Sequence, residues 1–262
     1  MFETPPLPSV AAASLSMILV AKNAELFFEQ LIDRWLRVLD GLGREVEVVF
    51  VDDDSADATK ELAAKIASQR PAFVAMESEE PHGIGAALRT GLATAKPHPL
   101  VGFAEFAPDY DPEDLKNLLE VMDQVDLVSG SRLQRASRFS GRRLLERWVF
   151  GVRFADPACP FKLFRSKVFE RIPLQSRGDF VHTEIIAKAN FLGSLMTEVP
   201  VVCHRPGKPA PDPFWKQDMK TVFYSPDFGP PPSPPVLESA AVATTALEDT
   251  LAASPPPPDD VL

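Results

Sequence analysis

Short β-branched runs alternate with longer segments of helical periodicity throughout residues 1–225, and this alternation constrains the fold more than any other feature. Strands that are separated by helices pair in a largely parallel sheet with the helices on its faces. The expected strands cover 14–20, 45–51, 72–76, 100–104 and 127–129. The expected helices cover 24–39, 57–68, 85–95 and 185–192, and one more begins at Pro112. The sequence therefore predicts an α/β fold with a mostly parallel sheet flanked by helices.

The helix that begins at Pro112 carries the clearest start signal. Asp111 precedes it as an N-cap candidate, and Glu113 and Asp114 lie in the expected first turn. Acidic side chains there interact favourably with the positive end of the helix dipole. We therefore expect this helix to begin directly after Asp111.

The last part of the chain differs in composition from the rest. Ten of the 27 prolines and six acidic residues fall in 226–262, which has no basic residue. Such a segment buries too little apolar surface to fold, so we expect a disordered tail that could act as a spacer or dock a protein partner. The predicted organisation is an N-terminal arm at 1–13, a domain at 14–208, an extension packed on it at 209–225, and this tail.

Charge and composition exclude several classes of protein. A formal charge of −10 argues against a protein that coats nucleic acid. The two cysteines and four histidines lack metal-ligand spacing, which disfavours zinc sites and disulfide frameworks. The longest uncharged stretch, 4–21, contains three prolines and is not a membrane-spanning helix, and no secretory signal is evident. We therefore expect a cytoplasmic protein, with any membrane contact peripheral.

Polar residues follow several of the expected strands, where the loops of a parallel sheet converge on a ligand. In strand order they are Asn23 and Glu25; Asp52, Asp53 and Asp54; Gly83; Glu105 and Asp109; and Gly130, Ser131 and Arg132. Three consecutive carboxylates repel one another, so a bound ribose, base or cation would stabilise the 52–54 triplet. The alternative for one or two of these acids is capping of the next helix by Asp54, Ser55 or Asp57.

Two helix starts carry further candidates. Gly83 and Gly85 flank the start of the helix at 85–95, where glycines let backbone N–H groups approach a phosphate or simply form a hinge. Glu184 stands at the start of the helix at 185–192. It is a candidate for acceptor binding, and an ordinary helix-start acid is the alternative.

Residues 130–165 concentrate positive charge in an otherwise acidic chain. The interval has nine basic residues against only Glu146 and Asp156. Such crowding costs free energy unless an anion binds, and arginine forms forked contacts with phosphate oxygens. Apolar residues interleave with the arginines at 144–152, so the segment could also rest as an amphipathic helix on an anionic membrane, turn an apolar stripe to the core, or present a solvated basic face.

Taken in order, these segments resemble glycosyltransferase family 2, and most closely its dolichyl- and polyprenyl-phosphate sugar transferases. The resemblance covers about 14–208. It rests on motifs at 19–25 (LVAKNAE), 51–57 (VDDDSAD), 83–91 (GIGAALRTG), 110–115 (YDPEDL), 130–132 (GSR), 156–165 (DPACPFKLFR) and 198–201 (EVPV). Each motif is common, but their order and spacing are specific. The resemblance implies the GT-A fold, with a Rossmann-like sheet.

The resemblance also implies a nucleotide-sugar donor, such as a GDP- or UDP-hexose, and a divalent cation held by a D-x-D motif. Counting back from the motif at 110–115, this motif falls on Glu105-Phe106-Ala107, so its second carboxylate is missing. Asp109 and Glu105 are then the candidate ligands of Mg²⁺ or Mn²⁺. The implied donor-binding residues are Asn23, Glu25, Asp52, Asp53, Gly83 and Gly85.

The implied reaction is an inverting displacement at the anomeric carbon, with a polyprenyl or dolichyl phosphate as acceptor and a nucleoside diphosphate as leaving group. A phosphate acceptor is already ionised, so no strong general base is needed. Arginine or a cation would stabilise the leaving charge. The expected catalytic residues are Glu105, Asp109 and Arg132, and the expected acceptor-binding residues are Arg142, Arg143, Lys162 and Glu184.

Three positions depart from the family pattern: Ala107, Lys22 in place of a tyrosine, and Pro160 in place of a glycine. They leave open a catalytically impaired relative that serves as a binding or scaffold protein. A phospho-receiver domain also places acids after an early strand, but it has only about half this length and leaves the arginines unexplained.

Overall fold

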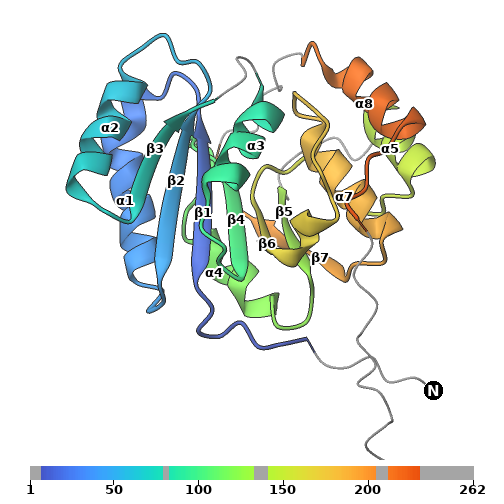
Figure 1. The fold of residues 1–262 in the computed structure, drawn as a ribbon, viewed down its shortest axis with the longest axis horizontal. Helices are drawn as coiled ribbons and strands as arrows, with labels where there is room; N and C mark the ends of the chain where they lie inside the picture. Colours follow the sequence, from blue (N-terminus) through green and yellow to red (C-terminus); the bar gives the residue numbers. More distant parts are fainter. Residues whose placement is uncertain (1–6, 79–82, 133–140, 205–211, 231–262) are drawn as a thin grey trace, which may run out of the picture. The chain divides into compact units, whose positions relative to one another are not determined.

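The computed structural model describes residues 7–78, 83–132, 141–204 and 212–230, apart from the side chains of 141–144 and Arg147. In this part, seven strands form one sheet in the order β3-β2-β1-β4-β6-β5-β7 (Figure 1). The strands are β1 (Leu15–Ala21), β2 (Val46–Asp52), β3 (Phe73–Glu77), β4 (Leu100–Glu105), β5 (Leu127–Arg132), β6 (Lys162–Arg165) and β7 (Met196–Val201). The helices are η1 (Glu25–Phe27, a 3-10 turn), α1 (Phe28–Asp40), α2 (Thr59–Gln69), α3 (Ile84–Thr94), α4 (Asp114–Val121), α5 (Gly141–Phe150), α6 (Lys167–Glu170), α7 (Val181–Phe191) and α8 (Trp215–Tyr224). The α/β fold predicted from the sequence is confirmed.

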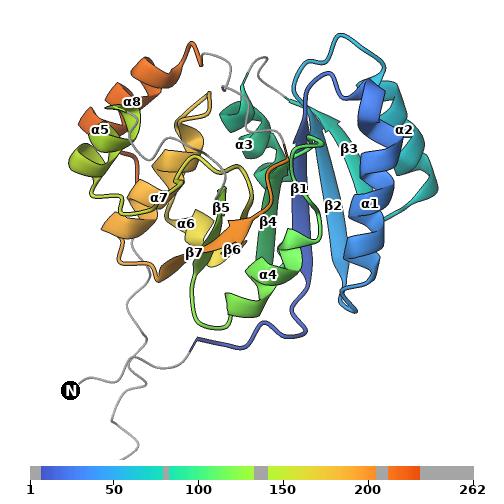
Figure 2. The same ribbon diagram turned by 180° about the vertical axis from the view of Figure 1, so that it is seen from behind.

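Both faces of the sheet are covered by helices, so the central strands are apolar on both sides (Figures 1 and 2). Along β1, Leu15, Met17 and Leu19 pack in the core that α1, α2 and α4 complete. The alternate residues Ile18 and Val20 pack in the core formed with α3 and α7. Because side chains alternate between the faces of a strand, a parallel strand buried on both faces is a mostly apolar run, and β1 and β2 have this pattern.

The strand β6 is the exception to the parallel arrangement. It lies between β4 and β5 and runs antiparallel to both, with Lys162 paired to Phe103 on one side and to Ser129 on the other. No strand was expected here from the sequence, because four residues are too few for a periodic pattern to separate strand from loop. The insertion separates β5 and β7 from the parallel strands β1 to β4.

Three helix starts differ from expectation, and one of them is that of α7, which was expected at residue 185 and begins at Val181. The helix expected at Pro112 begins at Asp114 instead. The carboxylate of Asp111 accepts the backbone N–H of Glu113, as an N-cap would. The residues that follow form hydrogen bonds to the carbonyl three residues earlier, such as Asp114 N–H to the Asp111 carbonyl, so this first segment is a turn rather than α-helix. The helix expected from residue 24 is divided into η1 and α1.

The chain after the domain continues to contact it. In α8, Trp215 lies 6.2 Å from the ring of Phe180 at the start of α7. Phe228 stacks on Phe191 with ring centroids 5.1 Å apart, and Gly229 N–H donates to the Arg171 carbonyl. The compact unit therefore includes residues to 229, and the rest of the predicted tail, from residue 231, lies outside the described residues. None of the described helices is long and apolar enough to cross a bilayer.

Candidate active site

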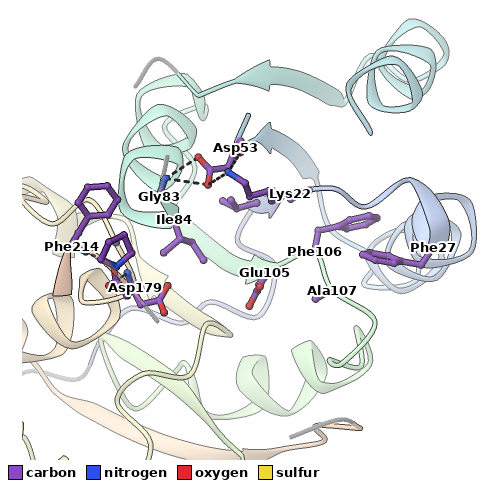
Figure 3. A pocket seen from close by; sticks show the side chains of 15 residues that line it. Lys22, Phe27, Asp53, Gly83, Ile84, Glu105, Phe106, Ala107, Asp179 and Phe214 are labelled. Carbon is purple, nitrogen blue, oxygen red and sulfur yellow. Dashed lines mark hydrogen bonds and ion pairs between the residues drawn. The ribbon is translucent and has the colours of Figure 1, made fainter. Parts of the chain in front are cut away.

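A pocket of about 480 Å³ opens at the carboxyl ends of β1, β2 and β4 (Figure 3). This is where the loops of a parallel sheet are expected to form a ligand site. Its charged lining residues come from five separate segments of the chain and are Lys22, Asp53, Glu105, Asp179 and Asp212. The structure thus brings three of the predicted site residues, Asp53, Gly83 and Glu105, to one cavity.

Asp53 joins three loops at one end of the pocket. Its two carboxylate oxygens accept the backbone N–H of Gly83 at 3.0 and 3.1 Å. The ammonium group of Lys22 donates to the Asp53 carbonyl at 2.9 Å and lies 3.8 Å from its carboxylate (Figure 3). Lys22, which replaces the family's tyrosine, therefore brings a positive charge to the pocket wall beside Asp53.

Glu105 and Asp179 project into the same space from opposite walls (Figure 3). The pKa of Glu105 is raised above its ordinary value, first because surrounding protein desolvates the carboxylate and next because Asp179 is a nearby negative charge; Arg132 opposes the effect. The Glu105 side chain remains accessible to water in the pocket, so solvent screens part of this repulsion. Asp179 escaped the sequence analysis because it lies far along the chain, and its only signal was its place before α7.

Asn23 and Glu25 hold two loops together rather than lining the pocket. The amide oxygen of Asn23 accepts the N–H of Ala56 at 2.8 Å, and the carboxylate of Glu25 accepts that of Ala58 at 3.2 Å. Asn23 adopts a positive φ of 53°. Both side chains thus tie the loop after β1 to the loop after β2, which positions Asp53 between them.

The acidic triplet after β2 divides between local and pocket roles. Asp52 accepts the N–H of Ser55 at 3.1 Å, a turn contact outside the pocket lining. Asp57 accepts the N–H of Thr59, the first residue of α2, at 3.1 Å, which satisfies a free helix-start donor as capping predicts. Asp53 alone of the triplet lines the pocket.

Gly83 and Gly85 allow a close approach of protein backbone. A Cβ atom at Gly85 would lie 2.3 Å from the carbonyl oxygen of Ser176, and one at Gly83 would lie 2.3 Å from that of Arg177. The N–H of Gly85 donates to the Arg177 carbonyl at 2.8 Å. The two glycines therefore seat the 176–178 segment against the start of α3 and bring Asp179 to the pocket, and both of their N–H groups already have acceptors within the protein.

Comparison with known proteins identifies the family. The model of glycosyl transferase family 2 matches residues 16–186. The chain belongs to glycosyltransferase family 2. The dolichol-phosphate mannosyltransferase of Pyrococcus furiosus is 28% identical over 200 residues, which cover 71% of this chain and 55% of that protein. The polyprenol monophosphomannose synthase of Mycolicibacterium smegmatis is 29% identical over 175 residues, 60% of this chain and 66% of that protein.

The chain spans about half the length of several curated relatives that it matches. Among solved structures it is similar to the glucosyl-3-phosphoglycerate synthase of Mycobacterium tuberculosis, which was crystallised with Mn²⁺, uridine diphosphate and phosphoglyceric acid. The TM-score is 0.61 at 24% identity, over 76% of this chain and 72% of that one. This likeness confirms the GT-A fold.

The residues of this glycosyltransferase that could bind such a divalent cation are only partly present in the pocket. Glu105 keeps a carboxylate in the pocket, but Ala107 supplies none, and Asp109 is not among the lining residues. Over the described residues, no group of three His, Cys, Asp or Glu side chains is arranged to hold a metal ion. Within the described residues the site therefore has no complete set of metal ligands, although the charge of Asp109 is near enough to raise the pKa of Glu105.

Arg132, the expected catalytic arginine, is held by protein partners. Its guanidinium forms a forked contact with Asp156 at 2.5 and 2.8 Å and donates to the Tyr110 hydroxyl at 3.1 Å. Burial raises the pKa of that hydroxyl far above its ordinary value. Arg132 is not among the residues that line the pocket, but its positive charge opposes the rise in the pKa of Glu105.

Lys162 is fully buried in β6, away from the pocket. Its ammonium group donates to the Ser129 hydroxyl at 2.8 Å and to the Pro157 carbonyl at 3.1 Å. Burial lowers its pKa to about 8, although nearby Cys159 and Asp156 oppose the shift. This location favours a structural role over the acceptor binding expected from the sequence.

Glu184 also lies in the interior. Its carboxylate accepts the N–H groups of Gln175 and Ser176, each at 2.8 Å, and pairs with Lys188 at 2.7 Å. This location again favours a structural role over acceptor binding: Glu184 holds the segment that leads to Asp179. Arg142 and Arg143 lie in α5, but their side chains are outside the described residues.

Proposed function

We propose that this glycosyltransferase moves a hexose from a nucleotide sugar, such as a GDP- or UDP-hexose, to a polyprenyl or dolichyl phosphate with inversion at the anomeric carbon. The observation that carries the proposal is the pocket in which Lys22, Asp53, Glu105 and Asp179 converge at the carboxyl ends of the parallel strands. The names of the relatives in Pyrococcus and Mycolicibacterium support a polyprenyl-type acceptor.

The two ends of the pocket can bind different parts of the nucleotide-sugar donor. Asp53 and Lys22 offer an acceptor and a donor of hydrogen bonds to a nucleoside, and Glu105 and Asp179 face the space left for the sugar. The raised pKa of Glu105 reduces the negative charge that this end presents to an anionic donor and acceptor. Because the acceptor phosphate is ionised, displacement needs alignment of its oxygen with the anomeric carbon rather than a strong base.

Transfer of label from a nucleotide hexose to polyprenyl phosphate is the test. We expect the wild-type chain to label the lipid and Asp53→Ala to lose most of that activity, with Asp54→Ala, the neighbour outside the pocket, as the matched control. Nucleotide binding by calorimetry without transfer from any common donor would instead support the scaffold function, which the lost carboxylate at Ala107 favours.

A single substitution tests the cation requirement. The proposed reaction has no step that depends on Mg²⁺ or Mn²⁺, because the described residues do not supply a complete set of metal ligands. We expect nucleotide affinity in the wild type to change less than about threefold on addition of Mn²⁺, and Ala107→Asp to gain about tenfold or more. Calorimetry with and without a chelator measures both. A strong cation requirement in the wild type would contradict this expectation.

A further inference from the structure

Two neighbouring helices expose large apolar side chains to solvent. In α5, Trp148 is 81% exposed and Leu145 is 40% exposed. In α8, Tyr224 is 77% exposed and Phe223 is 49% exposed. Scattered single apolar residues are ordinary on a protein surface, but aromatic residues grouped on adjacent helices are typical of an interaction surface.

The exposed residues of α8 form one stripe along the helix. Lys216, Lys220, Phe223 and Tyr224 follow at intervals of three, four, seven and eight residues, which brings them to one side of an α-helix. All four are exposed, and Val222 on the opposite side is buried. The solvent face of α8 therefore carries both lysine and aromatic side chains, whereas the solvent face of an ordinary amphipathic helix is polar.

Helix α5 has the same division of sides. Glu146 is buried and Phe150, one turn later, packs on Phe180 with ring centroids 5.6 Å apart. Leu145 and Trp148 lie on the other side of the helix and are exposed. Phe150 also contacts Phe223 of α8 at 6.1 Å, and both ribbon views show α5 beside α8 (Figures 1 and 2).

The acidic side chains of α5 and α8 are buried and do not lie on the solvent faces of these helices. The single acid of α5 is Glu146 and that of α8 is Asp218, and both are buried. Three arginines in α5 and two lysines in α8 are the other charged residues of these helices. In a chain with a formal charge of −10, the exposed charged side chains that the structure describes on these helices, Lys216 and Lys220, are thus both basic.

We propose that the solvent faces of α5 and α8, with Leu145, Trp148, Lys216, Lys220, Phe223 and Tyr224, dock on an anionic lipid bilayer. Aromatic side chains partition to the interface between headgroups and acyl chains, and basic side chains are attracted to anionic headgroups. The acceptor chemistry of the proposed function is a lipid phosphate, so this inference deepens that function and rests on it for its purpose.

The docking surface adjoins the pocket through the start of α8. Phe214, directly before α8, lines the pocket, and Trp215 contacts Phe180, which also contacts Phe150 of α5. A lipid phosphate held by the bilayer would therefore approach the protein beside the wall that carries Asp179. Docking through α5 and α8 therefore brings the pocket close to the membrane.

Vesicle binding by the full chain is the test. Vesicles of phosphatidylcholine with about one quarter phosphatidylglycerol supply the anionic surface, and pure phosphatidylcholine supplies the neutral one. We expect sedimentation with the anionic vesicles only, weakened by raising NaCl from about 0.1 to about 0.5 M. Trp148 fluorescence is expected to be quenched by lipids with brominated chains, and Trp148→Phe to remove most of that quenching, because Trp35 is buried and Trp215 is partly buried against Phe180.

Matched variants separate docking from folding and from catalysis. Trp148→Ser and the pair Phe223→Ser with Tyr224→Ser are each expected to lower vesicle affinity about tenfold. Leu26→Ser removes an apolar side chain that is 98% exposed on η1 and is expected to leave affinity unchanged. Transfer to a detergent-dispersed acceptor should survive in the docking variants, so loss of docking and failure of the transferase are distinguishable.

Two results would overturn the proposal. One is vesicle binding that the variants do not weaken, with circular dichroism showing them folded. The other is self-association of the wild type, measured by analytical ultracentrifugation, that Trp148→Ser abolishes, because a second copy of the chain would then be the occupant of this surface.

Discussion

Charged residues border an open pocket in one half of the sheet and are buried among protein partners in the other half. At the ends of β1, β2 and β4, Lys22, Asp53 and Glu105 border an open pocket, and Asp179 faces them. In the half that contains β5, β6 and β7, charged groups such as Arg132, Asp156, Lys162 and Glu184 are buried or nearly so and are bonded to protein partners. The difference teaches that a charged residue in a family motif can maintain the site without touching the ligand.

The largest effect is expected where a buried ion pair is broken. Asp156→Asn leaves the Arg132 guanidinium, about one tenth exposed, without its forked partner, and loss of one member of a buried pair costs about 3–5 kcal/mol. Asp40→Asn breaks the exposed Arg70–Asp40 pair and should cost less than about 1 kcal/mol. Urea unfolding monitored by circular dichroism measures both. Equal costs would remove the distinction between the two regions.

The pocket acids should affect activity more than stability. We expect Asp179→Asn to lower sugar transfer about 10- to 100-fold, because the carboxylate faces Glu105 across the pocket. Its free energy of unfolding should change by less than about 1 kcal/mol, because the residue is only partly buried. Asp33→Asn, an exposed site on α1, serves as the control. Full activity in Asp179→Asn would place Asp179 with the structural acids instead.

The smallest effect is a pH-dependent gain in stability from Glu105→Gln. The raised pKa means that the folded chain binds the proton more tightly than the unfolded chain, so the penalty of this carboxylate grows as the pH rises from the unfolded pKa through the folded one. The variant should therefore be more stable than the wild type near pH 8, and the difference should vanish near pH 4.

Solvent access limits the size of this gain. Screening should keep it below about 1 kcal/mol, or roughly 2–4 °C in Tm. Thermal unfolding at the two pH values measures it, with Glu29→Gln on the solvent side of α1 as the control. A variant that is less stable near pH 8 would show that Glu105 stabilises the fold, as Glu184 is expected to do.

Much of the parallel half was predictable because its signals are local. The strands β1, β2 and β4 are mostly apolar over six or seven residues, and Asp53 and Glu105 stand at or next to their ends. Carboxyl ends of parallel strands meet at one edge of a sheet, so the two acids could be expected in one site. The basic interval at 130–165 was harder to interpret, because composition does not show which charges find partners inside the protein.

The sequence by itself determined the order of the first five strands and of the helices between them, the apolar faces that cover the sheet, and the family to which the chain belongs. Only the tertiary structure decided that Asp179 stands opposite Glu105, that Arg132 is bound by Asp156, and that β6 enters the sheet antiparallel. The physical reason is the range of the interactions. Periodicity records contacts within a turn or a strand, whereas a site is made by residues that are distant along the chain and meet only when the sheet closes.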